Sequence, residues 1–280
     1  MREIDAGAIT ERVRDACIEA CTVLPGGVID ALKHAREIEE SPAGRDVFDE
    51  IIENAEIARA EQVPICQDTG LALVFVELGQ DAHISGGDLS EAINEGVRRG
   101  YEDGYLRKSI VRHPLDRANT GDNTPAVIHT EIVPGDGLTI TVAPKGGGSE
   151  NMSAARMLNP SDGREGVVRF VVETVRNAGS NPCPPVIVGV GLGGTLEKAA
   201  ILSKKAILRT LGRPSRNAVD AELEHDLLRA VNATGVGPAG LGGRVTALAV
   251  HVESYPCHIA SLPVAATLQC HAARHVSFEI

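Results

Sequence analysis

The sequence predicts a mixed α/β fold in which a helical N-terminal portion packs on a domain that contains a β-sheet. Apolar residues recur every three or four positions through the first sixty residues, a spacing typical of amphipathic helices. Short apolar runs such as 72–78 and 185–190 indicate strands in the remainder. No internal repeat or low-complexity linker is present. We therefore expect one domain over residues 1–280, with a helical portion in 1–60 and an α/β portion in 61–280.

Three helices are expected at the N-terminus. Pro25-Gly26-Gly27 and Ser41-Pro42 interrupt the helical spacing and mark the two connections. Cys17 and Cys21 fall on the apolar face of the first helix. A buried free cysteine behaves as a small hydrophobic residue, so we expect both thiols to lie in the core instead of binding a metal.

The elements after residue 60 follow from apolar runs and local start signals. Asp88 with Glu91 resembles a capping box that opens a helix. Strands near 126–133 and 137–143 are separated by Pro134-Gly135-Asp136-Gly137, which predicts a hairpin. The other expected elements are a helix through 167–175, a strand at 185–190, helices at 195–211 and 217–232, a strand at 244–252, and a short helix leading into Cys270.

Composition and charge exclude several classes of protein. Lysine and arginine total 27 against 38 aspartate and glutamate residues, so the formal charge of −11 repels nucleic acid and anionic membranes. With four Phe, three Tyr and no Trp, the chain lacks the stacking platforms of a single-strand binder. No run of about 18 apolar residues and no signal peptide is present. We expect a soluble, cytoplasmic protein that binds neither nucleic acid nor membrane.

The segment Cys66-Gln67-Asp68-Thr69-Gly70 places a thiol, an amide and a carboxylate side by side. Thiolates bind iron and carboxylates move protons. Cys183 lies between prolines in a segment that cannot be helical, which suits a thiolate presented to a cluster. Cys257 and Cys270 compete as a third thiolate. Three thiolates from such distant loops would leave one iron of a cluster free to do chemistry.

Two polar, glycine-rich segments, Asn119–Pro125 and Pro144–Asn151, flank the two strands of the expected hairpin. Such loops can direct several backbone N–H groups toward an anion, although tight turns are the alternative. Because the second segment also carries Lys145, the pair favours a binding site.

The segment Gly189–Gly194 fits the G-x-G-x-x-G pattern of dinucleotide-binding proteins after a strand and before a helix. That pattern also requires an acidic residue about 20 positions later, at the end of a second strand. The sequence near residue 209 is instead helical and basic. Close packing of a helix on a strand is therefore the expected role of these glycines, and a nucleotide-dependent oxidoreductase is a distant alternative.

Four segments in order resemble those of the iron–sulfur hydro-lyases, the family of class I fumarate hydratases and L-tartrate dehydratases. They are Cys66–Gly70, Asn119–Ala126, Pro144–Asn151 and Cys183–Pro185. The match runs from about residue 5 to the end, and the chain resembles the α subunit of the two-subunit form. The resemblance implies a [4Fe–4S] cluster held by three cysteines.

Carried over residue by residue, the resemblance implies that Cys66, Cys183 and Cys270 bind the cluster. Cys270 is preferred to Cys257 because it follows a small-residue run with Pro-Val and precedes Ala and Arg274, as in the family. The family histidine matches His258, although Cys257 stands where the family has an arginine before it.

The resemblance also implies the residues that contact substrate. Asp68 and His258 are the expected catalytic residues. Arg107 falls where the family has an arginine that binds a substrate carboxylate, with Arg112 and Arg117 as nearby alternatives. The full set of expected substrate-binding residues is Gln67, Asp68, Arg107, Gly146, Gly147, Gly148 and His258.

The resemblance implies that this α subunit interconverts fumarate and L-malate, with L-tartrate dehydration as the alternative activity. The base that removes the carbon-bound proton is expected on a β subunit, in an α2β2 assembly, so the α subunit alone should be inactive. A zinc-stabilised interaction subunit that uses Cys66, Cys183, Cys270 and His258 is a third hypothesis. The carboxylate and amide of Asp68 and Gln67 disfavour it, because a structural zinc site does not need them.

Overall fold

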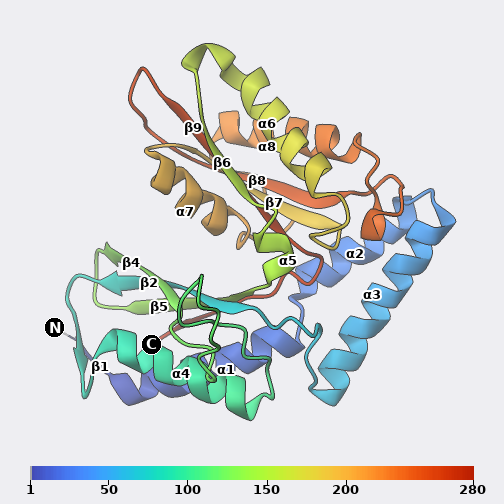
Figure 1. Ribbon diagram of the computed structural model, residues 1–280. Coiled ribbons are helices and arrows are strands. Elements are labelled where there is room, and N and C mark those ends of the chain that lie inside the picture. Colours follow the sequence, from blue (N-terminus) through green and yellow to red (C-terminus); the bar gives the residue numbers. More distant parts are fainter. Residues whose placement is uncertain (1) are drawn as a thin grey trace. The chain divides into compact units, whose positions relative to one another are not determined.

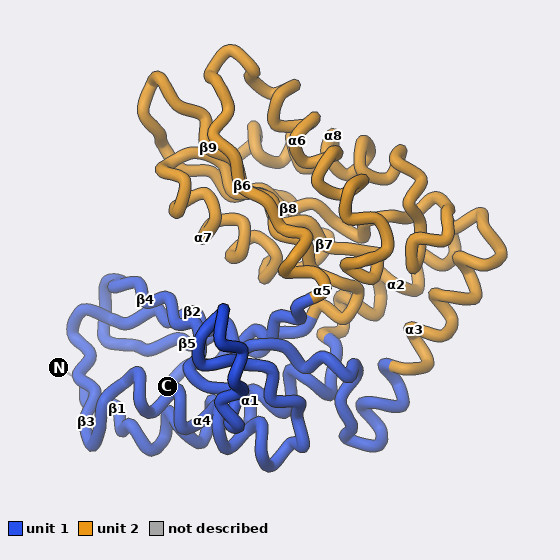
Figure 2. The backbone as a smooth tube through the Cα atoms, in the orientation of Figure 1, with its two compact units in different colours: residues 1–24, 55–147, 274–280 blue, residues 25–54, 148–273 orange. Residues whose placement is uncertain are grey.

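The computed structural model describes residues 2–280, and the chain divides into two compact units (Figures 1 and 2). Unit 1 contains the residues up to 24, 55–147 and 274–280, and unit 2 contains 25–54 and 148–273. The mixed α/β fold class is confirmed, with helices filling most of the first sixty residues. The expectation of a single domain over 1–280 stays a prediction.

Unit 1 contains a four-stranded sheet in the order β10-β5-β2-β4, with α1 and α4 on one face (Figure 1). A separate two-stranded sheet pairs β1 with β3 in parallel. The elements are β1 (Arg2–Asp5), α1 (Ala6–Thr22), β2 (Leu71–Gly79), β3 (Ala82–Ser85), α4 (Leu89–Asp103), β4 (Val127–Val133), β5 (Leu138–Lys145) and β10 (Val276–Glu279).

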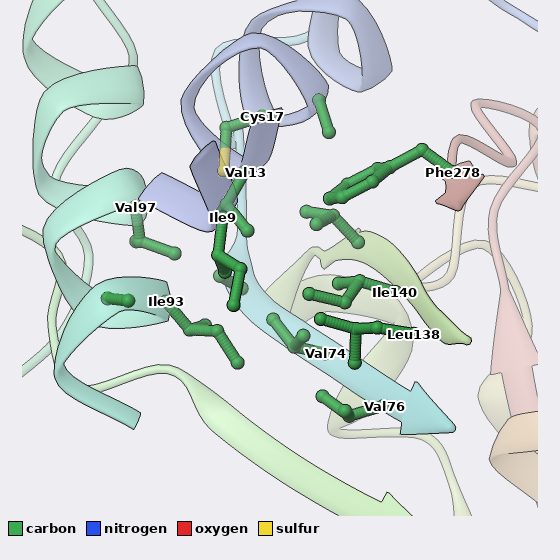
Figure 3. Packing of buried hydrophobic residues seen from close by; sticks show 14 of the residues in the cluster. Ile9, Val13, Cys17, Val74, Val76, Ile93, Val97, Leu138, Ile140 and Phe278 are labelled. Carbon is green, nitrogen blue, oxygen red and sulfur yellow. The ribbon is translucent and has the colours of Figure 1, made fainter. Parts of the chain in front are cut away.

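The core of unit 1 forms where α1 and α4 meet the sheet (Figure 3). Gly96 and Gly100 of α4 let the helices approach closely: a Cβ on Gly100 would lie 2.8 Å from the Cβ of Cys17. Cys17 and Cys21 are both 0% exposed, which confirms that these thiols pack in the core. Each fully buried aliphatic side chain here stabilises the fold by about 1.5–3 kcal/mol.

The expected hairpin between β4 and β5 is wrong. β2 lies between them in the sheet, parallel to β4 and antiparallel to β5. The residues Leu73–Val76 of β2 are all buried, so this strand takes the central position and pairs on both sides. The turn after β4 instead packs against the end of β2, where the Gly79 N–H donates to the Gly137 carbonyl at 2.8 Å.

Unit 2 contains a second four-stranded sheet, in the order β6-β9-β7-β8. Helices α6 and α8 cover one face, and α7 covers the other (Figure 1). The elements are α2 (Gly26–Ile38), α3 (Pro42–Glu61, of which residues up to 54 belong to unit 2), α5 (Gly147–Glu150, with Gly147 in unit 1), β6 (Ala154–Leu158), η1 (Pro160–Asp162), α6 (Gly163–Ala178), β7 (Val186–Gly193), α7 (Leu196–Ala206), α8 (Ala218–Asn232), η2 (Pro238–Gly240), β8 (Ala247–Tyr255) and β9 (Leu262–Gln269).

The glycines of the G-x-G-x-x-G segment lie under α7. β7 directs its valines toward α6 and α8, and it directs Gly189 and Gly191 toward α7. A Cβ on Gly191 would lie 1.8 Å from the Ala199 carbonyl oxygen, and one on Gly189 would lie 2.1 Å from that of Ser203. The expected role in helix–strand packing is confirmed for these two glycines.

The short helix expected before Cys270 is wrong, because this segment is strand β9. Val264, Ala266 and Leu268 alternate into the core with period two, and β9 pairs with both β6 and β7. Residues 263–269 of this strand are all buried, and pairing with two neighbouring strands outweighs the helix-favouring alanines.

Replacing Gly191 with alanine should destabilise the chain by about 1–3 kcal/mol, because the added methyl group forces α7 away from β7. Urea denaturation of the purified chain measures this change. Gly27→Ala is the matched control: no atom lies within 4 Å of its Cβ position, and it lies in α2. The control should be neutral or slightly stabilising, and equal effects at both sites would contradict the packing argument.

Candidate functional site

The Cys66–Gly70 segment of unit 1 is a loop between α3 and β2. The Ile65 N–H donates to the Cys21 carbonyl at 2.9 Å, which fixes the start of the loop on the end of α1. Burial raises the pKa of the Cys21 thiol to about 11, so this thiol stays protonated and contacts the Thr69 carbonyl at 3.8 Å. Cys66 itself is half-buried, and its sulfur accepts from the Asp68 N–H at 3.4 Å. The thiol that the sequence assigns to a metal is therefore the more accessible one.

Gly70 ends this loop at a close approach of two backbones. Its φ is +78°, and a Cβ would lie 2.6 Å from the carbonyl carbon of Lys145. Only glycine fits both conditions. The Gly70 carbonyl accepts from the Tyr101 hydroxyl at 3.0 Å and from Asn123 Nδ2 at 3.2 Å. The backbone of Lys145 and the side chains of Tyr101 and Asn123 therefore fix the end of this loop.

The Asp68 carboxylate joins this loop to the glycine-rich segment. Oδ1 accepts from the Gly70 N–H at 3.0 Å, and Oδ2 accepts from the Gly147 N–H at 2.8 Å. A Cβ on Gly146 would lie 3.1 Å from Oδ2. Unit 1 therefore brings together Cys66, Asp68, Gly146 and Gly147, whose roles in a site stay predictions. The Gly147 N–H is directed at a carboxylate of the chain itself.

Arg107 lies beside the same loop, and its carbonyl accepts from the Thr69 hydroxyl at 3.1 Å. Its side chain is exposed, and no ion pair of this guanidinium occurs among residues 2–280. Asn123 is fully buried and accepts from the Ser109 N–H at 2.6 Å while donating to Gly70, so it ties the Arg107 segment to the Cys66 loop.

The Asn119–Pro125 segment uses its side chains to hold the structure. Burial alone would raise the pKa of Asp122. Hydrogen bonds from Thr124 and Arg98 outweigh burial and lower this pKa to about 2. Asp122 therefore stays ionised at neutral pH and bonds Thr124 N–H at 3.0 Å and Arg98 Nε at 3.1 Å. The expected presentation of backbone amides to an anion stays a prediction.

Arg274 is a residue whose role the sequence did not indicate, although it belongs to the pattern after Cys270. It belongs to unit 1, is only 3% exposed, and donates from Nη2 to the Asp68 carbonyl. Its Nε and Nη1 are buried and have no hydrogen-bond partner in the described part of the chain. A buried guanidinium with two unsatisfied nitrogens is costly unless an anionic group lies against it.

In unit 2, the Cys183 and Cys270 segments lie side by side at one end of the sheet. Cys183 precedes β7 and Cys270 follows β9, and these strands are antiparallel, with Ile187 paired to Gln269. The Cys183 carbonyl accepts from the backbone N–H of His271 at 3.4 Å and lies 3.0 Å from its Nδ1.

The glycine-rich segment reaches the same end of unit 2. A Cβ on Gly148 would lie 3.1 Å from the Asn181 carbonyl oxygen, two residues before Cys183. Lys204 of α7 binds both carboxylate oxygens of Glu150 at 2.6 Å, which anchors this segment to the helix. Unit 2 thus groups Gly148 with Cys183 and Cys270.

His258 lies at the other end of unit 2. It belongs to the turn between β8 and β9, and all of β9 separates it from Cys270, roughly 25 Å along a strand of this length. Its Nδ1 accepts from the Ala260 N–H at 3.1 Å. With Cys257, it lines a hollow of about 710 Å³ beside the start of α7. Unit 2 therefore does not bring His258 to the Cys183–Cys270 group.

In the described residues, none of the six cysteines forms a disulfide bond. Unit 1 contains Cys66, while unit 2 contains Cys183 and Cys270, so neither unit alone holds the predicted set of three. Over the described residues, no three His, Cys, Asp or Glu side chains converge as a metal-binding group. The set of three ligands stays a prediction.

The chain matches the family model of fumarate hydratase (Fumerase) over residues 10–279. A Methanocaldococcus jannaschii protein, provisionally named L(+)-tartrate dehydratase subunit alpha, is 44% identical over 272 residues, covering 95% of each chain. The L(+)-tartrate dehydratase subunit alpha of Escherichia coli strain UTI89 is 36% identical over 276 residues, covering 97% of this chain and 90% of that protein. The protein of the same name from strain K12 is 36% identical over 270 residues, covering 95% and 88%.

Replacing Tyr101 with phenylalanine should destabilise the chain by about 1–2 kcal/mol, because the Thr69 and Gly70 carbonyls lose a buried donor. Guanidinium denaturation of the full chain without metal measures the loss. Tyr105→Phe removes the same atom from a side chain that is 92% exposed and should have no effect. A Tyr101→Phe variant as stable as this control would show that the hydroxyl does not hold the loop.

Proposed function

Because the chain belongs to the fumarate hydratase (Fumerase) family of hydro-lyases, we propose that it is the α subunit of a [4Fe–4S]-dependent L(+)-tartrate dehydratase. The observation that carries this proposal is the 44% identity, over 95% of both chains, to a relative provisionally named for that activity. Two more relatives with the tartrate name match at 36% identity. Fumarate hydration to L-malate, which the sequence favoured, becomes the second candidate, supported by the description of the family model.

Cys66, Cys183 and Cys270 would hold the cluster. The surroundings of Cys66 suit an anionic group, because the buried guanidinium of Arg274 lies in the same loop network with two unsatisfied nitrogens. Cys183 and Cys270 lie on adjoining segments of unit 2, and neither forms a disulfide bond. When bound through three thiolates, such a cluster supplies a Lewis acid at its fourth iron, which assists loss of hydroxide from the substrate.

The residues of the Cys66 loop would bind substrate and control a proton. Gln67 is exposed, and its Oε1 lies 3.6 Å from the Cys66 sulfur, so its amide can hydrogen-bond a substrate oxygen nearby. Asp68 would hold the substrate hydroxyl group, and in the hydration direction it would accept the proton that water loses as its hydroxide adds to the double bond. The two backbone N–H groups on the Asp68 carboxylate keep its orientation fixed during this step.

Two elements would bind the substrate carboxylates. The exposed guanidinium of Arg107 can clamp a carboxylate with two parallel hydrogen bonds. The glycine segment Gly146–Gly148 would contribute backbone amides. Because the Gly147 N–H already donates to Asp68, this residue would act on the substrate through Asp68.

Two of the sequence predictions are not used in this proposal. Within unit 2, His258 is separated from Cys270 by β9, so we assign it no part in the chemistry next to the cluster. The G-x-G-x-x-G segment carries no nucleotide proposal, because Gly189 and Gly191 are covered by α7.

The relatives are named as α subunits, which implies a β partner. We propose that the β subunit supplies the base for the carbon-bound proton, that the assembly is α2β2, and that it is cytoplasmic. In the described residues, every helix is too short or too polar to cross a membrane.

The purified α chain, with its cluster reconstituted without oxygen, should turn over substrate only when the β chain is added. L(+)-tartrate should exceed L-malate and fumarate in kcat/KM by about tenfold or more, because a site that hydrogen-bonds a second hydroxyl discriminates against its absence. Steady-state assays of all three acids measure this ratio. Preference for fumarate would support the second candidate, and full turnover by α alone would refute the need for a partner.

Cys270→Ser and Cys257→Ser distinguish the two candidates for the third ligand. Serine replaces the thiolate by a poor ligand for iron, so Cys270→Ser should lose both the visible absorption of the cluster and the activity. Cys257→Ser should keep both, since Cys257 lies with His258 at the far end of β9. The reverse result would exchange the roles of the two cysteines.

A further inference from the structure

Glu39, between α2 and α3, is a buried carboxylate that the proposed reaction does not use. Its side chain is 0% exposed. Oε1 accepts from the backbone N–H groups of Glu40 at 2.8 Å and Ser41 at 2.9 Å. Burial by itself would raise the pKa of Glu39, but its backbone hydrogen bonds outweigh burial and lower the pKa. The group is therefore charged at neutral pH.

The same carboxylate holds the loop between α8 and β8, residues 233–246. The Arg244 N–H lies 2.9 Å from Oε1 and 3.0 Å from Oε2, and the Val245 N–H donates to Oε2 at 2.9 Å. A Cβ on Gly243, where φ is +141°, would lie 2.7 Å from Oε1. The backbone can approach the carboxylate only because this residue is glycine.

The other side of this loop contacts the segment that carries Cys183. The Ala239 N–H donates to the Pro184 carbonyl at 2.8 Å. A Cβ on Gly240 would lie 2.5 Å from the Cβ of Ser180, whose carbonyl accepts from the Cys183 N–H at 2.9 Å. A continuous series of backbone contacts therefore runs from Glu39 through the loop to both sides of Cys183.

Both ends of the contact between the loop and the Cys183 segment have an unfavourable backbone conformation. Cys183 has φ of +54° and Ala239 has φ of +50°, and neither is glycine. Non-glycine residues keep left-handed conformations only where their surroundings fix them. The four backbone N–H groups bound by Glu39 provide such a fixed support.

We infer that Glu39 is a positioning residue for Cys183, acting through the 233–246 loop. The inference rests on the proposed function only in the purpose that it gives to Cys183, which is to present its thiolate to the cluster. The contacts themselves lie wholly within unit 2. Loss of the Glu39 charge should release the 233–246 loop, and the Cys183 segment should then lose the support of that loop.

Amide hydrogen exchange of the full chain without cluster tests this inference. In Glu39→Gln, segments 237–245 and 181–186 should both exchange about tenfold faster or more, because charged acceptors make the stronger hydrogen bonds. Segment 66–70, in unit 1, should not change. Glu40→Gln is the matched control: Glu40 also pairs with Arg244, but through an exposed side-chain contact of 2.8 Å, and its exchange should match the wild type.

A second measurement connects the exchange to the cluster. In the complex with the β chain, iron release to a chelator should be faster in Glu39→Gln than in Glu40→Gln. If Glu39→Gln does not fold, Glu39→Asp keeps the charge on a shorter side chain. Its amide exchange in 237–245 and 181–186 should also be faster than in the wild type, but by a smaller factor.

Two exchange results would overturn the inference. Faster exchange in 237–245 with none in 181–186 would show that the loop does not hold Cys183. A uniform increase that includes 66–70 would show general destabilisation instead of positioning. If the wild-type complex binds no iron, the proposed function fails, and the exchange measurement still decides the role of Glu39.

Discussion

Unit 1 depends on one close approach, in which the backbone of Gly70 lies against the backbone of Lys145 with no room for a side chain. The approach fixes where β2 begins beside β5, and it places the preceding loop over the end of α1. Tyr101, Asn123 and Asp68 then satisfy the polar groups that the approach buries. A loop so constrained leaves its thiol and carboxylate in fixed positions, as a reaction that moves protons requires.

In unit 2, different groups hold the loops that carry candidate functional side chains. The loops at one end of its sheet carry Cys183 and Cys270, and backbone polar groups of these loops are paired with one another or with a buried charge. His271 connects the Cys183 and Cys270 segments, and the Glu39 carboxylate fixes the neighbouring loop. In both units, the backbone of the loops is held by hydrogen bonds while the functional side chains stay accessible. These hydrogen bonds keep the polar loops ordered beside a sheet.

Elements whose character depends on their own periodicity could be predicted from the sequence, and those that depend on distant partners could not. Helix α4 begins where Asp88 caps it, and Gly189 packs under α7 as expected. The order of β2, β4 and β5 was missed because a central strand can insert between two neighbours in the sequence. In the site, the Cys66–Gly70 loop was evident from its residue types. The roles of Arg274 and Glu39 were not, because each contacts residues some 200 positions away.

The proposed function requires this chain to hold an iron–sulfur cluster with one iron open to substrate. Quantifying iron, acid-labile sulfide and zinc in the α–β complex, purified without oxygen, tests it most directly. We expect about four iron and four sulfide per α chain, as for a [4Fe–4S] cluster. One zinc per chain with no sulfide would contradict the proposed function and would identify the three cysteines as a structural metal site.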